Sequence, residues 1–160
     1  MWAINGYGYT CITFKVDGED DQALITNYQP NDMFKQNHEL SVSHQEIIFR
    51  GYMNDKVTQH TVQHNCREWT TLFLDYTQNS KKTVEYTYIL NNDPKMQGSF
   101  TLQAPQVEQN NYFVGGRKDG THFLSGAIHA IDIYENPENP KPIPESLKHT
   151  IVKSQQMKLI

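Results

Sequence analysis

Apolar residues recur at every second position along much of the chain. In residues 9–16, Ile12, Phe14 and Val16 alternate with polar or small residues. A period of two buries one face of a β-strand and leaves the other face to solvent. Similar short segments follow at intervals of about ten residues, with turn-forming residues between them. We therefore predict ten strands, at residues 9–16, 23–26, 39–43, 46–52, 57–64, 69–77, 83–90, 98–104, 111–115 and 122–134.

The predicted strands follow one another without the 3.6-residue period of a helix between them. Regular short strands of this kind are typical of an antiparallel sandwich or barrel. We place the sharpest turn at Asn91–Pro94, because Asn and Asp accept a positive φ and Pro cannot continue a strand ladder.

Two strands change parity along their length. The apolar positions shift by one residue between Trp69 and Leu72, and again between Ile128 and Ile131. An extra residue in a strand keeps apolar groups on one face while it bends the sheet. We therefore predict a β-bulge in each of these strands, and a curved sheet with a concave face.

The composition changes after Tyr134. Four prolines in residues 137–144 exclude a helix and a central strand there, and Pro144 can open a short helix after them. We expect one domain over residues 1–160, with a core at about 9–134 and a proline-rich strap plus short helix at 135–155.

The totals exclude several classes of protein. The net charge of −4 at pH 7 does not favour nonspecific nucleic-acid binding, which needs clustered Lys and Arg. The chain has no apolar run of about 20 residues, so we expect no membrane insertion, and its start does not resemble a signal peptide. Hydrophobic residues make up only 37%, but nine Tyr and seven Phe supply large apolar rings for a core. Cys11 and Cys66 form either one disulfide or two free thiols.

Four segments together resemble a known family. They are the strand before DGEDDQALIT (17–26), EWTTLFLDYT (68–77), FVGGRKDGTHFLSGAIHAIDIY (113–134) and IPESLKHTIV (143–152). In this order, over about residues 9–152, they resemble the laminin G-like branch of the concanavalin A-like jelly rolls. The resemblance implies an all-β, antiparallel two-sheet jelly-roll sandwich, in an extracellular or cell-surface setting. It also suggests that the chain is a module of a larger multidomain protein. The sequence does not assign an oligomeric state.

The resemblance implies recognition of a glycan or a protein partner through rim loops or the concave sheet face, in adhesion or surface recognition. Exposed tyrosines suit this task because they combine a flat apolar ring with a hydroxyl. Charged residues in the glycine-rich connection form a second contact set. The candidate ligand-binding residues are Tyr9, Tyr112, Arg117, Lys118 and Asp119.

Two groups of residues suggest metal sites. Asp17, Asp20 and Asp21 suit a calcium ion, which laminin G-like domains place at a sandwich rim; the other interpretation is a solvated turn. His60 and His64 share a face if they lie on one strand, but about 13 Å of strand separates them, which is too far for one zinc ion. We expect no required cofactor, with calcium as the one candidate.

Residues 131–135 (IDIYE) resemble the carboxylate-bearing strand of bacterial laminarinase-type glucanases, another concanavalin A-like family. Those enzymes begin this motif with a glutamate, where this chain has Ala130. A retaining glycosidase needs two carboxyl groups about 5 Å apart, so we predict that the domain is not an enzyme. The alternatives are a polysaccharide hydrolase or lyase on the same fold, and a packing domain of a larger assembly.

Overall fold

The computed structural model of the chain describes residues 7–27, 37–53, 56–78, 83–103 and 113–136. These residues form ten strands, and none of the described residues is helical. Within the described ranges, no helix is long and apolar enough to cross a membrane. The strands are β1 (Tyr7–Val16), β2 (Gln22–Thr26), β3 (Asn37–Val42), β4 (Glu46–Met53), β5 (Lys56–Gln63), β6 (Thr70–Gln78), β7 (Thr83–Leu90), β8 (Gln97–Gln103), β9 (Phe113–Val114) and β10 (Gly126–Asn136).

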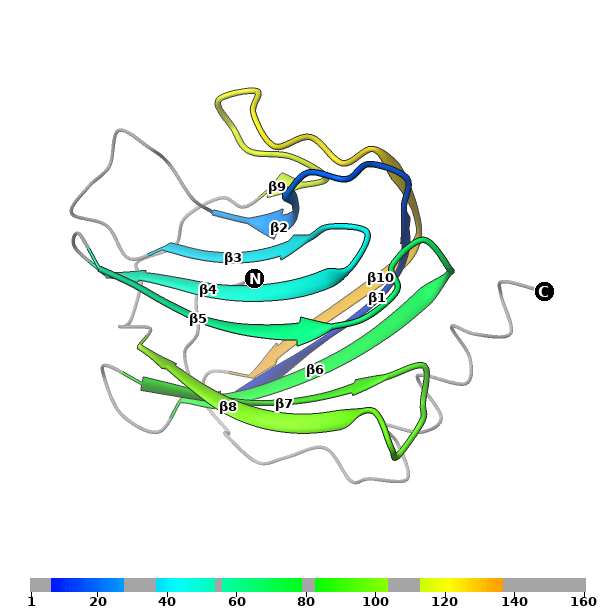
Figure 1. Ribbon diagram of the computed structural model, residues 1–160. Coiled ribbons are helices and arrows are strands. Elements are labelled where there is room, and N and C mark those ends of the chain that lie inside the picture. The colour runs from blue at the N-terminus through cyan, green and yellow to red at the C-terminus, as the bar shows by residue number, and fades with distance from the viewer. Residues whose placement is uncertain (1–6, 28–36, 54–55, 79–82, 104–112, 137–160) are drawn as a thin grey trace.

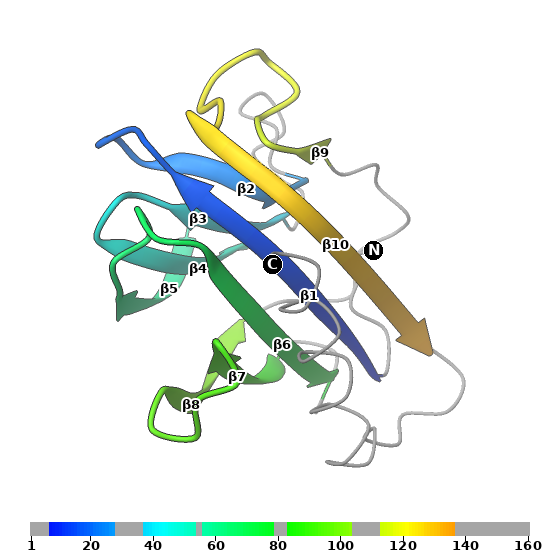
Figure 2. The same cartoon turned by 90° about the vertical axis from the view of Figure 1, so that its right-hand side faces the viewer.

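The strands form two antiparallel five-stranded sheets that face each other (Figure 1). Sheet A has the order β10-β1-β6-β7-β8, and sheet B has the order β5-β4-β3-β2-β9. Figure 2 shows β10, β1 and β6 side by side in sheet A. The predicted all-β, two-sheet jelly-roll sandwich is confirmed. Two residues of the predicted strap, 135 and 136, belong to β10 instead, and the rest of the strap and the predicted helix lie outside the described residues.

Alternate side chains of both sheets meet in one core. Ile12, Phe14 and Val16 of β1 point inward and are fully buried, as the two-residue period predicted. Burying one such side chain contributes about 1.5–3 kcal/mol. Aromatic rings fill the interior beside β5 and β8, where Phe100 stacks on His60 with 4.3 Å between ring centroids and on Tyr86 with 5.0 Å.

The predicted bulge in the last strand is confirmed. The pairing of β1 with β10 steps from Ala130 directly to Ile128, so His129 is the extra residue. The bulge predicted in the Trp69 strand is wrong, because β6 begins after Trp69 and pairs with both neighbours without a shift. A bulge that the sequence did not predict occurs in β2, where Leu24 is skipped between two paired residues.

Five connections gather at one end of the sandwich, which we call the turn rim. Backbone hydrogen bonds join them: Val16 N donates to Cys66 O (2.8 Å), and Cys66 N donates to His44 O (3.0 Å). The predicted turn at Asn91–Pro94 is confirmed, since Asn91 and Asn92 have φ values of 53° and 54°. The rim consists of residues 17–21 (β1–β2), 43–45 (β3–β4), 64–69 (β5–β6), 91–96 (β7–β8) and 115–125 (β9–β10).

Candidate ligand-binding site

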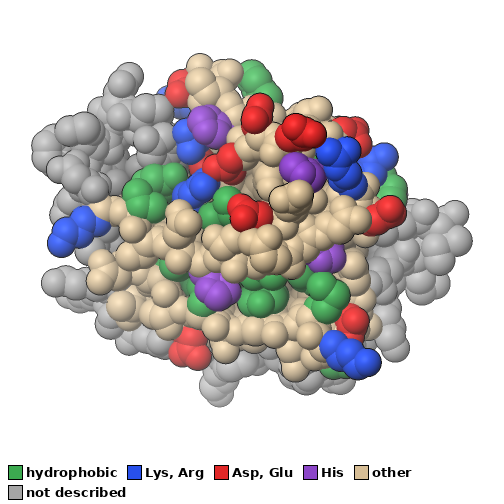
Figure 3. Space-filling view, in the orientation of Figure 1, with side chains coloured by type: hydrophobic (Ala, Val, Ile, Leu, Met, Phe, Trp, Pro, Cys, Tyr) green, Lys and Arg blue, Asp and Glu red, His purple; other side chains and the backbone are tan. Residues whose placement is uncertain are grey.

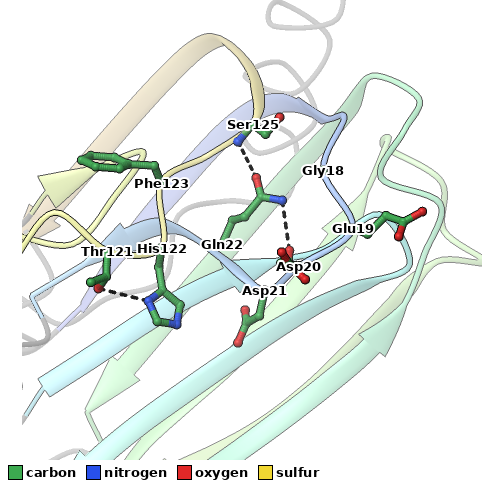
Figure 4. Close-up of a pocket in the computed structure, with 9 residues that line it drawn as sticks. All are labelled: Gly18, Glu19, Asp20, Asp21, Gln22, Thr121, His122, Phe123 and Ser125. Atoms are coloured by element: carbon green, nitrogen blue, oxygen red, sulfur yellow. Dashed lines mark hydrogen bonds between the residues drawn. The ribbon is translucent and has the colours of Figure 1, made fainter.

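A pocket of about 440 Å³ lies on the turn rim between the β1–β2 turn and the β9–β10 connection (Figure 4). We call these two segments the walls of the rim pocket. The predicted strand 122–134 begins only at Gly126, so residues 122–125 belong to the connection, and His122, Phe123 and Ser125 line the pocket. The lining residues are Gly18, Glu19, Asp20, Asp21, Gln22, Thr121, His122, Phe123 and Ser125.

Gln22 joins the two walls. Its side-chain Nε2 donates to the carbonyl oxygen of Asp20 (3.0 Å), and its Oε1 accepts a hydrogen bond from the backbone N–H of Ser125. Asp17 N also donates to Ser125 O (2.7 Å). Gly18 permits this close approach, because a Cβ atom there would lie 2.5 Å from Gln22 Nε2. The walls are therefore held together by the protein's own hydrogen bonds.

The β9–β10 wall is shaped by a tight turn. Asp119 Oδ1 accepts hydrogen bonds from Thr121 N (3.0 Å) and Thr121 Oγ1 (2.6 Å). The bond from the Thr121 hydroxyl is the main reason that the pKa of Asp119 lies below its usual value. Gly120 and His122 both have positive φ values, 81° and 55°, and His122 O accepts a hydrogen bond from Ala23 N (2.8 Å). A positive φ in a non-glycine residue is sparsely populated and often marks a functional site.

Phe123 supplies an apolar surface to this pocket. Its side chain is 65% exposed, and Figure 4 shows it on the β9–β10 wall. A Cβ atom at Gly116 would lie 2.5 Å from the Phe123 ring, so the ring packs against that glycine. The carboxylates of Asp20 and Asp21 and the hydroxyl of Thr121 lie around the same pocket. The pocket can therefore offer several hydrogen-bonding groups to a ligand, and the Phe123 ring on its β9–β10 wall points away from Gln22 and Asp21 (Figure 4).

A buried carboxylate lies in β3 beneath the β9–β10 wall. Glu39 is 0% exposed; its Oε2 accepts from Thr26 Oγ1 (2.8 Å) and Arg117 Nε (2.8 Å), and its Oε1 from Arg117 Nη2 (2.7 Å) and Ser41 Oγ (2.9 Å). Burial alone would raise the pKa of Glu39, but the hydrogen bonds and charge of Arg117, helped by the two hydroxyls, lower it below its usual value. Glu39 is therefore ionised and forms a bidentate ion pair with Arg117.

A second arginine extends this network to the other wall. Arg50 Nη1 lies 3.5 Å from Glu39 Oε1, and Arg50 Nη2 lies 2.7 Å from Asp21 Oδ2. Burial alone would lower the pKa of Arg50, but the hydrogen bond and charge of Asp21 raise it. Figure 3 shows charged side chains of both signs gathered at the top of the view, over β2, β3 and the β9–β10 connection.

The predicted contact residues have different positions in the structure. Arg117 lies in the β9–β10 connection, but its guanidinium is turned onto the sheet and pairs with Glu39. Lys118 and Asp119 are exposed on the turn beside the pocket. Tyr9 lies in sheet A and stacks between Phe73 (5.4 Å between centroids) and Tyr134 (5.5 Å), toward the other end of β1. Tyr112 lies outside the described residues.

Several pocket residues were missed in the sequence. Phe123 was assigned to a strand, where an apolar residue is expected to face the core, and Gln22 was not singled out. The signal that could have found them is the glycine spacing, because Gly115, Gly120 and Gly126 all have positive φ values and delimit a long connection.

The predicted metal residues lie on the β1–β2 wall. Asp20 and Asp21 line the pocket, Asp17 precedes them, and Asp21 is already paired with Arg50. Across the described ranges, no three His, Cys, Asp or Glu side chains are placed to hold a metal ion. Calcium binding at the turn stays a prediction.

The two cysteines are free thiols and both are buried. They lie in different apolar clusters, Cys66 in the main core and Cys11 on the outer face of sheet A. Burial raises the pKa of the Cys66 thiol to about 12, so it is protonated at neutral pH.

No model of a protein family matches the sequence. No curated protein matches it. Several solved structures have a similar fold. One is the LG4-5 fragment of the mouse laminin α1 chain, with a TM-score of 0.60 and 12% identity over 81% of this chain, which spans only 36% of that fragment.

A second similar structure is the CBM40 module of the Ruminococcus gnavus IT-sialidase, with a TM-score of 0.62 and 14% identity over 94% of this chain and 84% of the module. That module has also been solved with α2,3-sialyllactose bound. A third is the SAP-like pentraxin from Limulus polyphemus, with a TM-score of 0.54 and 10% identity over 92% of this chain and 70% of the pentraxin. The fold of this chain is the concanavalin A-like jelly roll that these three proteins share, and it is the fold that the laminin G-like resemblance predicted.

Proposed function

We propose that this domain is a non-catalytic recognition module that binds a carbohydrate in the rim pocket. The observation that carries the proposal is a pocket lined by carboxylate, hydroxyl and imidazole groups, with the exposed Phe123 ring on its β9–β10 wall. A sugar ring has an apolar face of C–H bonds and an edge of hydroxyls, so it matches one aromatic surface and several hydrogen-bonding groups.

The rigidity of the walls supports this proposal. Gln22 and Asp119 hold the two walls through hydrogen bonds within the protein, so the pocket is formed before a ligand arrives. A preformed site loses less conformational entropy on binding than a mobile one. Loops held on a rigid β-scaffold are also the usual position of binding residues.

The similar structures add support for a binding role. The CBM40 module has been solved with sialyllactose bound, which shows that this fold can present a sugar site. Sequence identities of 10–14% support a shared fold but not a shared ligand, so the proposal depends on the residues of the rim pocket. We extend it to recognition or adhesion at a cell surface or outside the cell, the setting that the laminin G-like resemblance implies.

The test is a glycan array followed by titration with the best binding sugar. The Phe123→Ala variant should bind about tenfold more weakly, because the sugar loses its apolar contact. Val57→Ala is the matched control, since Val57 is 51% exposed on β5 and does not line the pocket.

Two further measurements accompany the array. Product analysis should find the polysaccharide chain length unchanged after incubation, and array binding with and without a chelator tests the role of calcium. Absence of any glycan binding by the wild-type chain, or equal binding by Phe123→Ala, would contradict the proposal. Shortened polysaccharide chains would show that the domain is an enzyme instead.

A further inference from the structure

The two walls of the rim pocket are joined to the same buried carboxylate. On one side, Arg117 pairs with Glu39 through two hydrogen bonds of 2.8 and 2.7 Å. On the other side, Arg50 lies between Glu39 (3.5 Å) and Asp21 (2.7 Å). Asp21 lines the pocket, and Arg117 begins the turn that leads to Thr121.

The strand register explains why one carboxylate reaches both sides. Glu39 on β3 is paired with Thr26 on β2 and with Arg50 on β4, so the three side chains lie in a row across the outer face of sheet B. Thr26 and Arg50 both contact the Glu39 carboxylate directly. Glu39 is thus the middle residue of the row. On one side is Thr26 of β2, the strand that follows the β1–β2 wall, and on the other side is Arg50 of β4.

The turn after Arg117 is closed by its own backbone bonds. Arg117 N donates to Thr121 O (3.0 Å), and Gly120 N donates to Arg117 O (3.1 Å). Movement of the Arg117 guanidinium would therefore move the start of the wall that carries Phe123. Leu124 N donates to Gly115 O (3.0 Å) and closes the same connection further along.

Charge makes this arrangement depend on Glu39. The positive charges of the Arg50 and Arg117 guanidiniums are balanced by the negative charges of two carboxylates. Among the described ion pairs, Glu39 is the only carboxylate that contacts both arginines. Without its charge, two partly buried arginines would face each other across a neutral group, which is unfavourable. Arg117 would then gain from turning toward solvent.

We infer that Glu39 is the positioning residue of the rim pocket, and that its carboxylate sets the separation of the two walls and thereby the fit of the sugar. The part of this inference that concerns the sugar rests on the proposed function. Glu39 is 0% exposed and does not line the pocket, so it acts through Arg117 and Arg50 and not by contact with the ligand.

The first test uses the protein without ligand. Glu39→Gln keeps the shape of the side chain and removes its charge, and hydrogen exchange reports on the backbone bonds of the walls. We expect the Ala23, Arg117 and Leu124 amides, which are bonded within or to the β9–β10 connection, to exchange at least about tenfold faster. The Leu72 and Leu74 amides of sheet A should keep the wild-type rate.

Glu46→Gln is the matched control. Glu46 lies on the same sheet, and its carboxylate accepts a hydrogen bond from the exposed Gln63 side chain (3.0 Å) outside the network. If Glu39→Gln fails to fold, Arg117→Lys replaces it, because lysine keeps the charge but loses the two-pronged hydrogen bond. Wild-type exchange at the walls, or an equal increase in every strand, would overturn the inference.

The second test measures affinity for the sugar selected on the array. Glu39→Gln should bind it about tenfold more weakly, and Glu46→Gln should bind it as the wild type does. Faster exchange with unchanged affinity would overturn the link between wall position and binding. If the wild-type chain binds no sugar, the proposed function fails, while the exchange experiment still decides whether Glu39 positions the walls.

Discussion

The outer faces of the two sheets are both buried near their centres, but by opposite chemistry. Sheet B buries the ionised Glu39 among hydroxyls and two arginines. Sheet A buries Cys11 and Phe73, which are paired across β1 and β6 and packed against Tyr9. An apolar cluster is stabilised by area alone, whereas a buried charge must find partners with defined geometry. The face of sheet B is therefore the one that can fix a loop in a defined position.

One of the two largest effects should come from removing the partner of the buried charge. Arg117→Met leaves Glu39 without its bidentate ion pair, and this should lower the free energy of unfolding by about 3–5 kcal/mol. Urea denaturation followed by tryptophan fluorescence measures this change. A decrease in the free energy of unfolding of less than about 1 kcal/mol would mean that solvent or Arg50 replaces Arg117 as the partner of Glu39. The buried ion pair would then not distinguish the outer face of sheet B from that of sheet A.

Phe73→Ala is the counterpart on sheet A. It removes a side chain that is 2% exposed, and the cavity should cost about 3–5 kcal/mol. The two variants should therefore lower the free energy of unfolding by similar amounts. Arg117→Met does so by leaving a buried charge unpaired, and Phe73→Ala by opening a cavity. Stability alone does not distinguish an ionic face from an apolar one, so the comparison needs a variable that acts on charge.

Acid pH provides this variable. The pKa of Glu39 is lowered in the folded protein, because the hydrogen bonds and charge of Arg117 outweigh the opposing effect of burial. A carboxyl group of this kind stabilises the fold above its unfolded pKa of about 4.3, and this contribution is lost as the pH falls through the lower folded value. Stability of the wild-type chain should therefore fall as the pH decreases below about 4.

The dependence should differ between variants of the two faces. Glu39→Gln should show a weaker decrease in unfolding free energy between pH 5 and about pH 2 than the wild type, whereas Phe73→Ala should keep the wild-type slope. Some slope should remain in Glu39→Gln, because the pKa of Asp119 is lowered as well. Equal slopes in Glu39→Gln and the wild type would show that Glu39 does not titrate with unfolding.

The same comparison explains what could be predicted from the sequence. Alternation of apolar residues predicted all ten strands and a bulge between Ile128 and Ile131, because the period of a strand is local and each face repeats every two residues. The period does not report what covers an outer face. Glu39 reads as a solvent-facing residue of a strand, and its main partner Arg117 is 78 residues away along the chain.

The glycine-rich connection that the sequence singled out forms one wall of the rim pocket, and its side chains differ in position from what was predicted. The sequence indicated the glycine-rich connection, and Lys118 and Asp119 do lie on its exposed turn. Arg117 was expected to contact a ligand, yet its partner on β3 turns it inward. Phe123 was expected in a strand, and the turn closed by Asp119 and Thr121 instead leaves its ring at the pocket. Side-chain direction in a connection depends on contacts that alternation does not encode.

The smallest effect is expected at Trp69, which lies beside sheet A on the turn rim. Its side chain is 40% exposed, Lys15 Nζ lies 5.5 Å from its ring, and His129 meets its edge with 6.1 Å between centroids. Trp69→Ala should lower the free energy of unfolding by roughly 1 kcal/mol or less, since an exposed cation–π contact contributes little. Affinity for the sugar should not change, because Trp69 does not line the pocket. Weaker binding by Trp69→Ala, at wild-type stability, would extend the binding surface from the sheet B side of the rim onto sheet A. The division between a recognition face on sheet B and the face of sheet A that carries Cys11 and Phe73 would then no longer hold.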